Sequence, residues 1–186
     1  MKTIVVYRSK SNFVKRYATW IAEELSADVF DGSKVSVEML QAYDTIVYGG
    51  GLYESGINGV KLITGNLHRL QGRKVIVFAT GASPARQEAL DSVISHNFAL
   101  EQLEEIKFFY LRGGFDFSKL KARDRVLMTL LKWKMKWKKK RNIPLISDEI
   151  GMLAAYDKPA DFVKRKNIDE LVAYALSPEA PVHSVS

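Results

Sequence analysis

Four short apolar runs constrain the fold of this chain more than any other feature of the sequence. They occupy residues 3–7, 45–48, 74–79 and 107–111, and a weaker run covers residues 27–31. After a polar first residue, Thr or Lys, each of the four runs is continuously apolar and rich in β-branched or aromatic residues, whereas a strand with one solvent-facing side alternates. Continuous runs of this kind are typical of strands that are buried on both faces of a sheet.

Segments with helical spacing separate the runs. After the first run, Val14, Tyr17, Ala18, Ile21 and Leu25 recur at intervals that place them on one helical face. The same reasoning predicts helices over residues 13–25, 60–70, 86–98, about 119–141 and 168–176. Strands that alternate with such helices form βαβ units. We therefore expect an α/β fold with a doubly wound parallel sheet and helices on both faces.

The length and hydropathy of the chain fit one domain in water. The 186 residues suffice for a buried core, and we place the domain at residues 1–176, followed by a C-terminal tail at 177–186. No stretch approaches the ~18 apolar residues that span a bilayer. The apolar run near the N-terminus is too short for a signal peptide. We therefore expect a cytoplasmic protein.

Composition and motifs exclude several kinds of chemistry. The chain has no cysteine, which rules out disulfides, thiolate metal ligands and cysteine nucleophiles. His68, His96 and His183 are scattered without metal-ligand spacing, so no metal site is expected. The G-x-S-x-G elbow, the P-loop and a G-x-G-x-x-G motif after the first strand are missing. The formal net charge of +7 favours acidic partners such as phosphate groups, nucleic acid or an anionic membrane.

The loop after the first strand is the leading candidate for a phosphate site. Its residues are Ser9, Lys10, Ser11, Asn12, Phe13 and Val14. A helix begins in this loop, and the amides at a helix N-terminus carry partial positive charge and lack internal partners. Ser9 and Ser11 add hydroxyl donors, and Lys10 adds a cation. The competing interpretation is an ordinary strand–helix turn that Ser11 or Asn12 caps.

At this loop the chain resembles the flavodoxin-like family, whose phosphate loop reads roughly S/T-x-T-G-x-T. The resemblance continues through the segments IVYGGGLY, VIVFATGASP and FFYLRGGFDFSKL, and it covers roughly the first three-quarters of the chain. It is similar in particular to the flavodoxin-domain proteins that include menaquinone-dependent protoporphyrinogen dehydrogenases. The resemblance implies a five-stranded sheet in the order 2-1-3-4-5 and FMN as the cofactor.

Two positions depart from the family's phosphate loop. Asn12 stands where the family has glycine, and asparagine tolerates a left-handed backbone better than most residues. Val14 stands where the family has threonine, which removes one hydroxyl donor to phosphate. The loss of such a hydrogen bond lowers affinity by roughly ten- to hundred-fold. A binding protein that kept the fold and lost the cofactor is therefore the alternative.

The resemblance places the flavin ring between two further loops. On one side it implies contacts from Gly50, Gly51, Leu52 and Tyr53. Glycine lets the backbone approach a flat ring closely, and Tyr53 is the candidate for stacking on it. The alternative for Tyr53 is a surface aromatic residue that covers a loop.

On the other side the resemblance implies contacts from Thr80, Gly81, Ala82, Arg112, Gly113, Gly114 and Phe115. The Thr80 hydroxyl is a donor to the flavin or its ribityl chain, and Arg112 balances the phosphate or a reduced anionic flavin. The alternatives are a helix start at this loop, with Ser83 as N-cap and Pro84 at the first helical position, and a solvated surface arginine.

A strongly basic helix is expected after the fifth strand, at about 119–141. Trp133 and Trp137 lie among the lysines that run from Lys132 to Arg141. This combination is typical of a helix that contacts an anionic membrane surface, which here is the inner face of the membrane. Nucleic acid fits the charge but is disfavoured, because the fold offers no groove-reading element. The remaining interpretation is a solvated basic face whose tryptophans pack on the domain.

Together these features predict an FMN-dependent oxidoreductase or electron-transfer protein. Because the flavin carries the electrons or the hydride, no side-chain acid or base is assigned a catalytic role. The expected partner is a redox protein or a quinone, and protoporphyrinogen is a substrate that the resemblance implies. A module that docks to a partner or an anionic membrane through the basic helix is the alternative outside redox chemistry.

Overall fold

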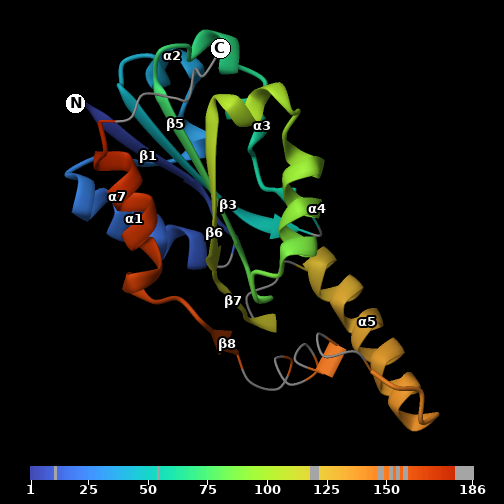
Figure 1. Cartoon of the computed structure of the whole chain (residues 1–186). Coiled ribbons are helices and arrows are strands. Elements are labelled where there is room, and N and C mark those ends of the chain that lie inside the picture. Colours follow the sequence, from blue (N-terminus) through green and yellow to red (C-terminus); the bar gives the residue numbers. More distant parts are fainter. Residues whose placement is uncertain are drawn as a thin grey trace.

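A computed structural model of the chain describes residues 1–10, 12–53, 55–117, 122–145, 149–150, 153, 156 and 159–178. Its centre is a parallel sheet, which Figure 1 shows running through the body of the molecule. The strands are β1 Thr3–Arg8, β2 Asp28–Asp31, β3 Thr45–Tyr53, β5 Lys74–Gly81 and β6 Ile106–Arg112. They lie in the order β2-β1-β3-β5-β6, which confirms the expected order of the five strands. The short β4, Gly56–Ile57, folds back antiparallel on the end of β3.

Helices cover both faces of this sheet, as the continuous apolar runs predict. The helices are α1 Phe13–Leu25, α2 Val37–Leu40, α3 Lys61–Thr64, α4 Gln87–Asn97, α5 Ala122–Lys140 and α7 Asp169–Leu176. One core cluster joins Ile4, Ile46 and Val77 to α2, α3 and α4. The other joins Val5 and Ile76 to α1 and α7. Figure 1 shows α5 extending away from this layered body.

The strand predicted from the apolar run at 45–48 does not end at the glycines 49–51, so the predicted boundary is wrong. β3 continues to Tyr53, and Gly49 pairs with Tyr7 on one side and Phe78 on the other. A Cβ atom at Gly49 would overlap the Phe78 ring. Glycine stands here because the ring of the neighbouring strand fills the space of a side chain. Gly49 is therefore explained by a packing contact within the sheet.

Other predicted boundaries shift for local reasons. The helix expected over 60–70 is split into α3 and a 3-10 turn at Leu67–Arg69. α4 begins at Gln87 with Arg86 at its N-cap position, so the expected cap at Ser83 is wrong. The helix expected over 119–141 appears as α5, and residues 119–121 lie outside the described part of the chain, as does most of the 177–186 tail.

The C-terminal part of the chain returns to the sheet through contacts that the sequence did not predict. β7 Gly114–Phe115 pairs antiparallel with β8 Ala160–Asp161. Near the other end of the sheet, the buried Lys74 points its ammonium group at the end of α7. Its Nζ donates to the carbonyl oxygens of Tyr174 and Ser177 at 3.1 and 2.5 Å. A cation at a helix C-terminus satisfies carbonyl groups that have no partner within the helix.

Among the described residues, no helix combines the length and the apolar character needed to cross a bilayer.

The glycine packing predicts a contrast between two neighbouring alanine variants. Gly49→Ala should lower the free energy of unfolding by about 1–3 kcal/mol, because the new methyl group displaces Phe78 in a filled core. Gly51→Ala should lower it by less than about 1 kcal/mol, since its Cβ would meet Tyr53 and Val14 atoms at an ordinary 3.7 Å. Urea unfolding followed by circular dichroism measures both. Equal losses in the two variants would contradict this account of β3.

Candidate functional site

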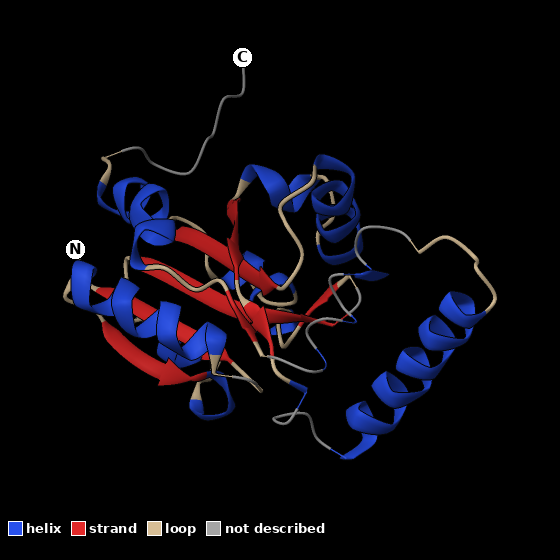
Figure 2. Cartoon of the chain, turned by 90° about the horizontal axis from the view of Figure 1, so that it is seen from below, coloured by secondary structure: helices blue, strands red, loops and turns tan. Residues whose placement is uncertain are grey.

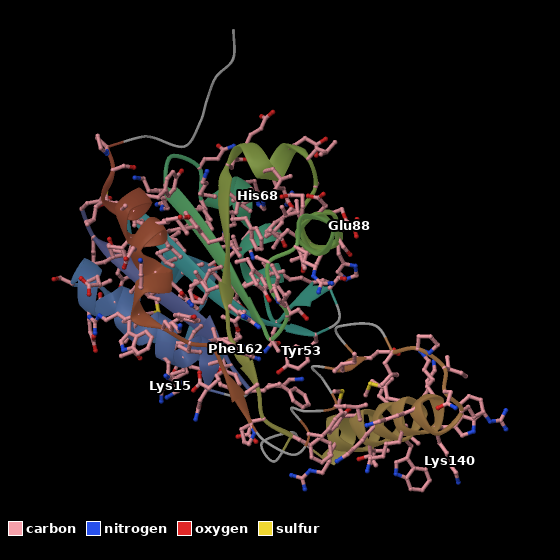
Figure 3. The ribbon with its side chains drawn as sticks, turned by 60° about the horizontal axis from the view of Figure 1, so that its bottom comes forward. Lys15, Tyr53, His68, Glu88, Lys140 and Phe162 are labelled. Atoms are coloured by element: carbon pink, nitrogen blue, oxygen red, sulfur yellow. The ribbon has the colours of Figure 1, made fainter. Side chains whose placement is uncertain are left out.

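The carboxyl ends of β1, β3, β5 and β6 lie side by side at one edge of the sheet. The parallel register pairs Gly51 with Thr80 and Gly81 with Arg112, so residues far apart in the sequence become neighbours. The segments 9–14, 50–53, 80–82 and 112–115, which end these strands or follow them, therefore form one group, which we call the strand-end site. In Figure 3, Tyr53 and Phe162 mark this end of the sheet. Ligands of open α/β sheets bind outside the carboxyl ends of the strands.

The first loop combines a left-handed turn with an unused donor. Asn12 has φ 66° and occupies the N-cap position of α1, so its backbone is left-handed. Its side chain forms no capping hydrogen bond to the described residues, and its interpretation as a cap is wrong. Ser9 Oγ is buried and has no hydrogen-bond partner within the described chain. Ser11 lies outside the described residues.

This donor set fits a phosphate group. A buried hydroxyl without a partner is rare, and such groups call for an explanation such as a ligand or an ion. The amides in the first turn of a helix lack intrahelical partners, and anions bind there. The loop offers three kinds of hydrogen-bond donor, which are Ser9 Oγ, the first-turn amides of α1 and the Lys10 ammonium group. None of them is negatively charged. Together they suit a negatively charged group with several oxygen acceptors, such as phosphate.

Phe13 and Val14 contribute backbone to this loop and direct their side chains elsewhere. Both side chains are buried in the core cluster beneath α1. The Val14 methyl group lies 3.7 Å from the position that a Cβ at Gly51 would take, and the Phe13 ring lies 2.8 Å from the corresponding position at Gly114. These two side chains therefore pack against Gly51 and Gly114, and neither offers a polar group to a ligand.

Lys10 and Tyr53 connect the first loop to the end of β3. The Lys10 ammonium group lies 3.8 Å from the centre of the Tyr53 ring, a cation–π contact. Tyr53 is 37% exposed, so its ring retains contact with solvent. Leu52 is half-buried and lies beside Gly81, where a Cβ would meet its Cδ1 at 3.3 Å.

The last residue of α4, Asn97, holds the turn after β3 through hydrogen bonds. Asn97 accepts a hydrogen bond from the Ile57 amide at 2.8 Å and donates to the Ser55 carbonyl at 2.6 Å. Gly50 lies directly under the same turn, since a Cβ there would be 2.9 Å from the Asn58 carbonyl oxygen. The sequence analysis missed Asn97, because a polar residue at a helix end carries no mark of its partner. Its effect is to fix the loop that carries Tyr53.

The loops after β5 and β6 are tied to each other. The Gly113 amide donates to the Gly81 carbonyl at 2.8 Å, and a Cβ at Gly113 would lie 3.2 Å from Thr80 Cβ. Tyr110 donates to the Ser83 carbonyl at 2.6 Å. Burial raises the pKa of the Tyr110 hydroxyl to about 12, so it stays a neutral donor into the alkaline range. These contacts leave the Thr80 side chain buried between the two loops.

The side chain of Arg112 is fixed by contacts with its neighbours, so its interpretation as a solvated surface arginine is wrong. Its guanidinium group stacks 3.7 Å from the centre of the Phe162 ring, and Nε donates to the Ala82 carbonyl at 3.3 Å. Below it, the buried Tyr17 donates to the Arg112 carbonyl at 2.6 Å and accepts from Asn167 at 2.6 Å. Burial is the main cause that raises the pKa of Tyr17.

Three residues that support Arg112 were missed by the sequence analysis. Phe162 and Asn167 come from the C-terminal segment, and Tyr17 counted only as a core position of α1. Nothing in the sequence pairs these residues with the end of β6. Phe115, in β7, packs its ring 5.6 Å from that of Tyr156 and lies on the side of the site toward α5. Across the described part of the chain, no cluster of three or more His, Asp or Glu residues is placed to hold a metal ion.

The order of the sheet and the loops at its edge define a flavodoxin-like α/β protein. A family model described as "Flavodoxin domain" matches residues 4–142, which is well over half of the chain. The chain therefore belongs to the flavodoxin-domain family.

Individual relatives are more distant. The chain is 37% identical over 54 residues to an uncharacterized protein of Methanocaldococcus jannaschii, a match to 28% of this chain and 36% of that protein. The match thus spans about a third of the relative's length. A putative flavoprotein from Bacteroides eggerthii is 13% identical with a TM-score of 0.45, over 59% of this chain and 85% of that one. A flavoprotein in complex with FMN from Lactobacillus acidophilus is 17% identical with a TM-score of 0.41, over 60% and 91%.

The left-handed Asn12 predicts a specific response to substitution. Asn12→Val should lower the free energy of unfolding by about 1–2 kcal/mol, because a β-branched residue is strained at φ 66°. Asn12→Gly, the matched control, should leave it unchanged within about 0.5 kcal/mol or raise it, because glycine adopts this backbone freely. Thermal or urea unfolding of the two variants measures the difference. A tolerated valine would mean that the turn is not left-handed.

The raised pKa of Tyr110 predicts a change in alkaline stability. The neutral hydroxyl is favoured in the folded state, so its contribution is complete below the unfolded pKa near 10 and is lost as the pH rises toward about 12. Tyr110→Phe cannot ionise and should lose less stability between pH 10 and 12 than the parent chain does. Urea unfolding at a series of pH values compares the two slopes. Parallel slopes would show that Tyr110 is not the group responsible.

Proposed function

We propose that this chain binds FMN at the strand-end site and acts as a flavodoxin-like oxidoreductase or electron-transfer protein. The observation that carries the proposal is the buried Ser9 hydroxyl, which has no hydrogen-bond partner among the described residues and lies in the same loop as the left-handed Asn12. Membership of the flavodoxin-domain family supports it, because residues 4–142 include all the loops of the site.

Each loop has a distinct task in this proposal. Ser9 Oγ and the first-turn amides of α1 donate to the phosphate, and Lys10 supplies a positive charge. Tyr53 offers a ring face on one side of the site, and Thr80 offers a hydroxyl on the other. The cation–π contact between Lys10 and Tyr53 keeps both side chains at the mouth of the site. Asn97 and Tyr110 hold the flanking loops in place through backbone carbonyls.

When bound, FMN supplies the electron or hydride chemistry that no side chain here provides. The protein's residues act by position and charge. Arg112 is held by Phe162 and by the Ala82 carbonyl, so its positive charge stays at this edge and favours a ligand that has gained negative charge. Thr80 is buried, and the linked loops around it exclude water from that side. No general acid or base is required.

The partner in this proposal is a redox protein or a quinone. The resemblance to menaquinone-dependent protoporphyrinogen dehydrogenases makes protoporphyrinogen the first substrate to assay. In this proposal the protein is cytoplasmic. Its single domain covers residues 1–176.

A second candidate function is a binding protein that retains the fold without the cofactor. Val14 favours it, because this side chain is buried in the core and provides no hydroxyl where the family has a threonine. The two candidates differ in one property, which is affinity for FMN.

A titration with FMN tests the proposal. Desalted protein should bind FMN saturably, with quenched flavin fluorescence and a shifted visible spectrum. Ser9→Ala should weaken binding by roughly ten- to hundred-fold, because a hydrogen bond to a charged group is lost. Ser95→Ala, an exposed serine on α4, is the matched control and should bind as the parent does. No saturable binding at tens of micromolar FMN would overturn the proposal in favour of the cofactor-free alternative.

A further inference from the structure

The contacts that α5 makes with the described part of the chain lie along one face of the helix. Met135 on this face is buried. Tyr156 donates to the Met128 carbonyl at 2.6 Å, and its ring lies 5.0 Å from the Lys132 ammonium group. Lys138 forms an ion pair with Glu149 at 2.7 Å. A cavity of about 720 Å³ lies on the same side of the helix and is lined by Lys136, Lys139, Asn142, Ile143, Leu145, Ile150 and Leu153.

The opposite face carries an exposed apolar stripe. Its members are Val126, Leu130, Trp133 and Trp137, which follow one another at intervals of four, three and four residues. Two residues turn a helix by about 200°, so both tryptophans lie across the helix from the buried Met135. Trp133 is 71% exposed and Trp137 is 51% exposed. The interpretation that these tryptophans pack on the domain is therefore wrong.

The stripe is set in a strongly positive segment. Residues 125–147 contain eight basic residues and no acidic residue, which exceeds the net charge of +7 of the whole chain. By the helical period, Lys134 and Arg141 flank the stripe on one side, and Lys140 flanks it on the other. The Arg141 guanidinium group lies 4.4 Å from the centre of the Trp137 ring. Tryptophan rings and cations thus share one surface of α5.

We propose that this stripe docks on an anionic phospholipid surface, with α5 lying in the plane of the headgroups. A helix with an apolar face that contains tryptophan and is bordered by lysine binds in this position. The rings enter the boundary between headgroups and acyl chains, and the cations contact lipid phosphate. Nucleic acid would match the charge alone and would leave the tryptophan stripe without a role. Figure 2 shows the long helix α5 standing apart from the sheet.

Docking in this position also bears on the strand-end site. α5 begins seven residues after Phe115, the last residue of that site, and at the same end of the sheet (Figure 1). A docked α5 therefore holds the strand-end site close to the membrane, within reach of an electron acceptor dissolved in lipid. This consequence rests on the proposed FMN function, whereas the docking itself does not.

Flotation with vesicles tests the docking without any flavin. The full chain should float at low salt with vesicles of phosphatidylcholine and phosphatidylglycerol, and should stay in the dense fraction with phosphatidylcholine alone. Trp133→Ala/Trp137→Ala should weaken the association by about tenfold or more. Lys134→Glu/Lys140→Glu should weaken it by about 25-fold or more, since each basic residue near the surface contributes about fivefold.

Matched controls separate the stripe from general charge. Lys34→Glu/Lys166→Glu changes the net charge by the same amount at exposed residues outside α5 and should float as the parent does. Leu100→Ala removes an exposed apolar side chain elsewhere and should also float. No flotation at low salt, or equal loss in both charge variants, would overturn the proposal. Binding of a duplex oligonucleotide without vesicle flotation would overturn it in favour of nucleic acid.

Discussion

The strands β1, β3, β5 and β6 pair in parallel, and their register determines which loops meet at the strand-end site. It places the ends of four strands in one row, so that Gly51 lies beside Thr80 and Gly81 beside Arg112. The register itself requires glycine at position 49, because the Phe78 ring occupies the space of a side chain. A β-branched residue there would push β3 and β5 apart and separate the loops that they carry. Core packing and site geometry therefore rest on the same contact.

The C-terminal segment completes the strand-end site from far along the sequence. Phe162 supports the Arg112 guanidinium group, and Asn167 holds Tyr17 against the Arg112 carbonyl. At the opposite end of the sheet, Lys74 fixes α7 through its last carbonyls. Burial of the Tyr17 hydroxyl costs little folding free energy only when all its hydrogen-bond partners are present. The position of Arg112 thus depends on α1, β6 and the segment before α7 together.

Much of this arrangement is predictable from the sequence, and the failures have physical causes. Continuous apolar runs give the strands, and resemblance gives their order, both of which are confirmed. The left-handed backbone at Asn12 is predictable from the sequence, because asparagine tolerates this conformation better than most other residues. The end of β3 was misjudged, because glycine in a sequence does not distinguish a turn from close packing. Asn97, Phe162 and Asn167 were missed because their partners are distant backbone groups and rings, for which local patterns carry no information.

In the function we propose, FMN binds at the strand-end site, with its phosphate at the loop that holds Ser9 and Asn12. The most direct measurement is the change in backbone amide resonances when FMN is added to isotopically labelled protein. We expect the largest changes in the segments 9–14, 50–53 and 80–82, with saturation at one FMN per chain. Changes confined to the residues that line the α5 cavity, such as Lys136 and Lys139, or no changes at all, would contradict it.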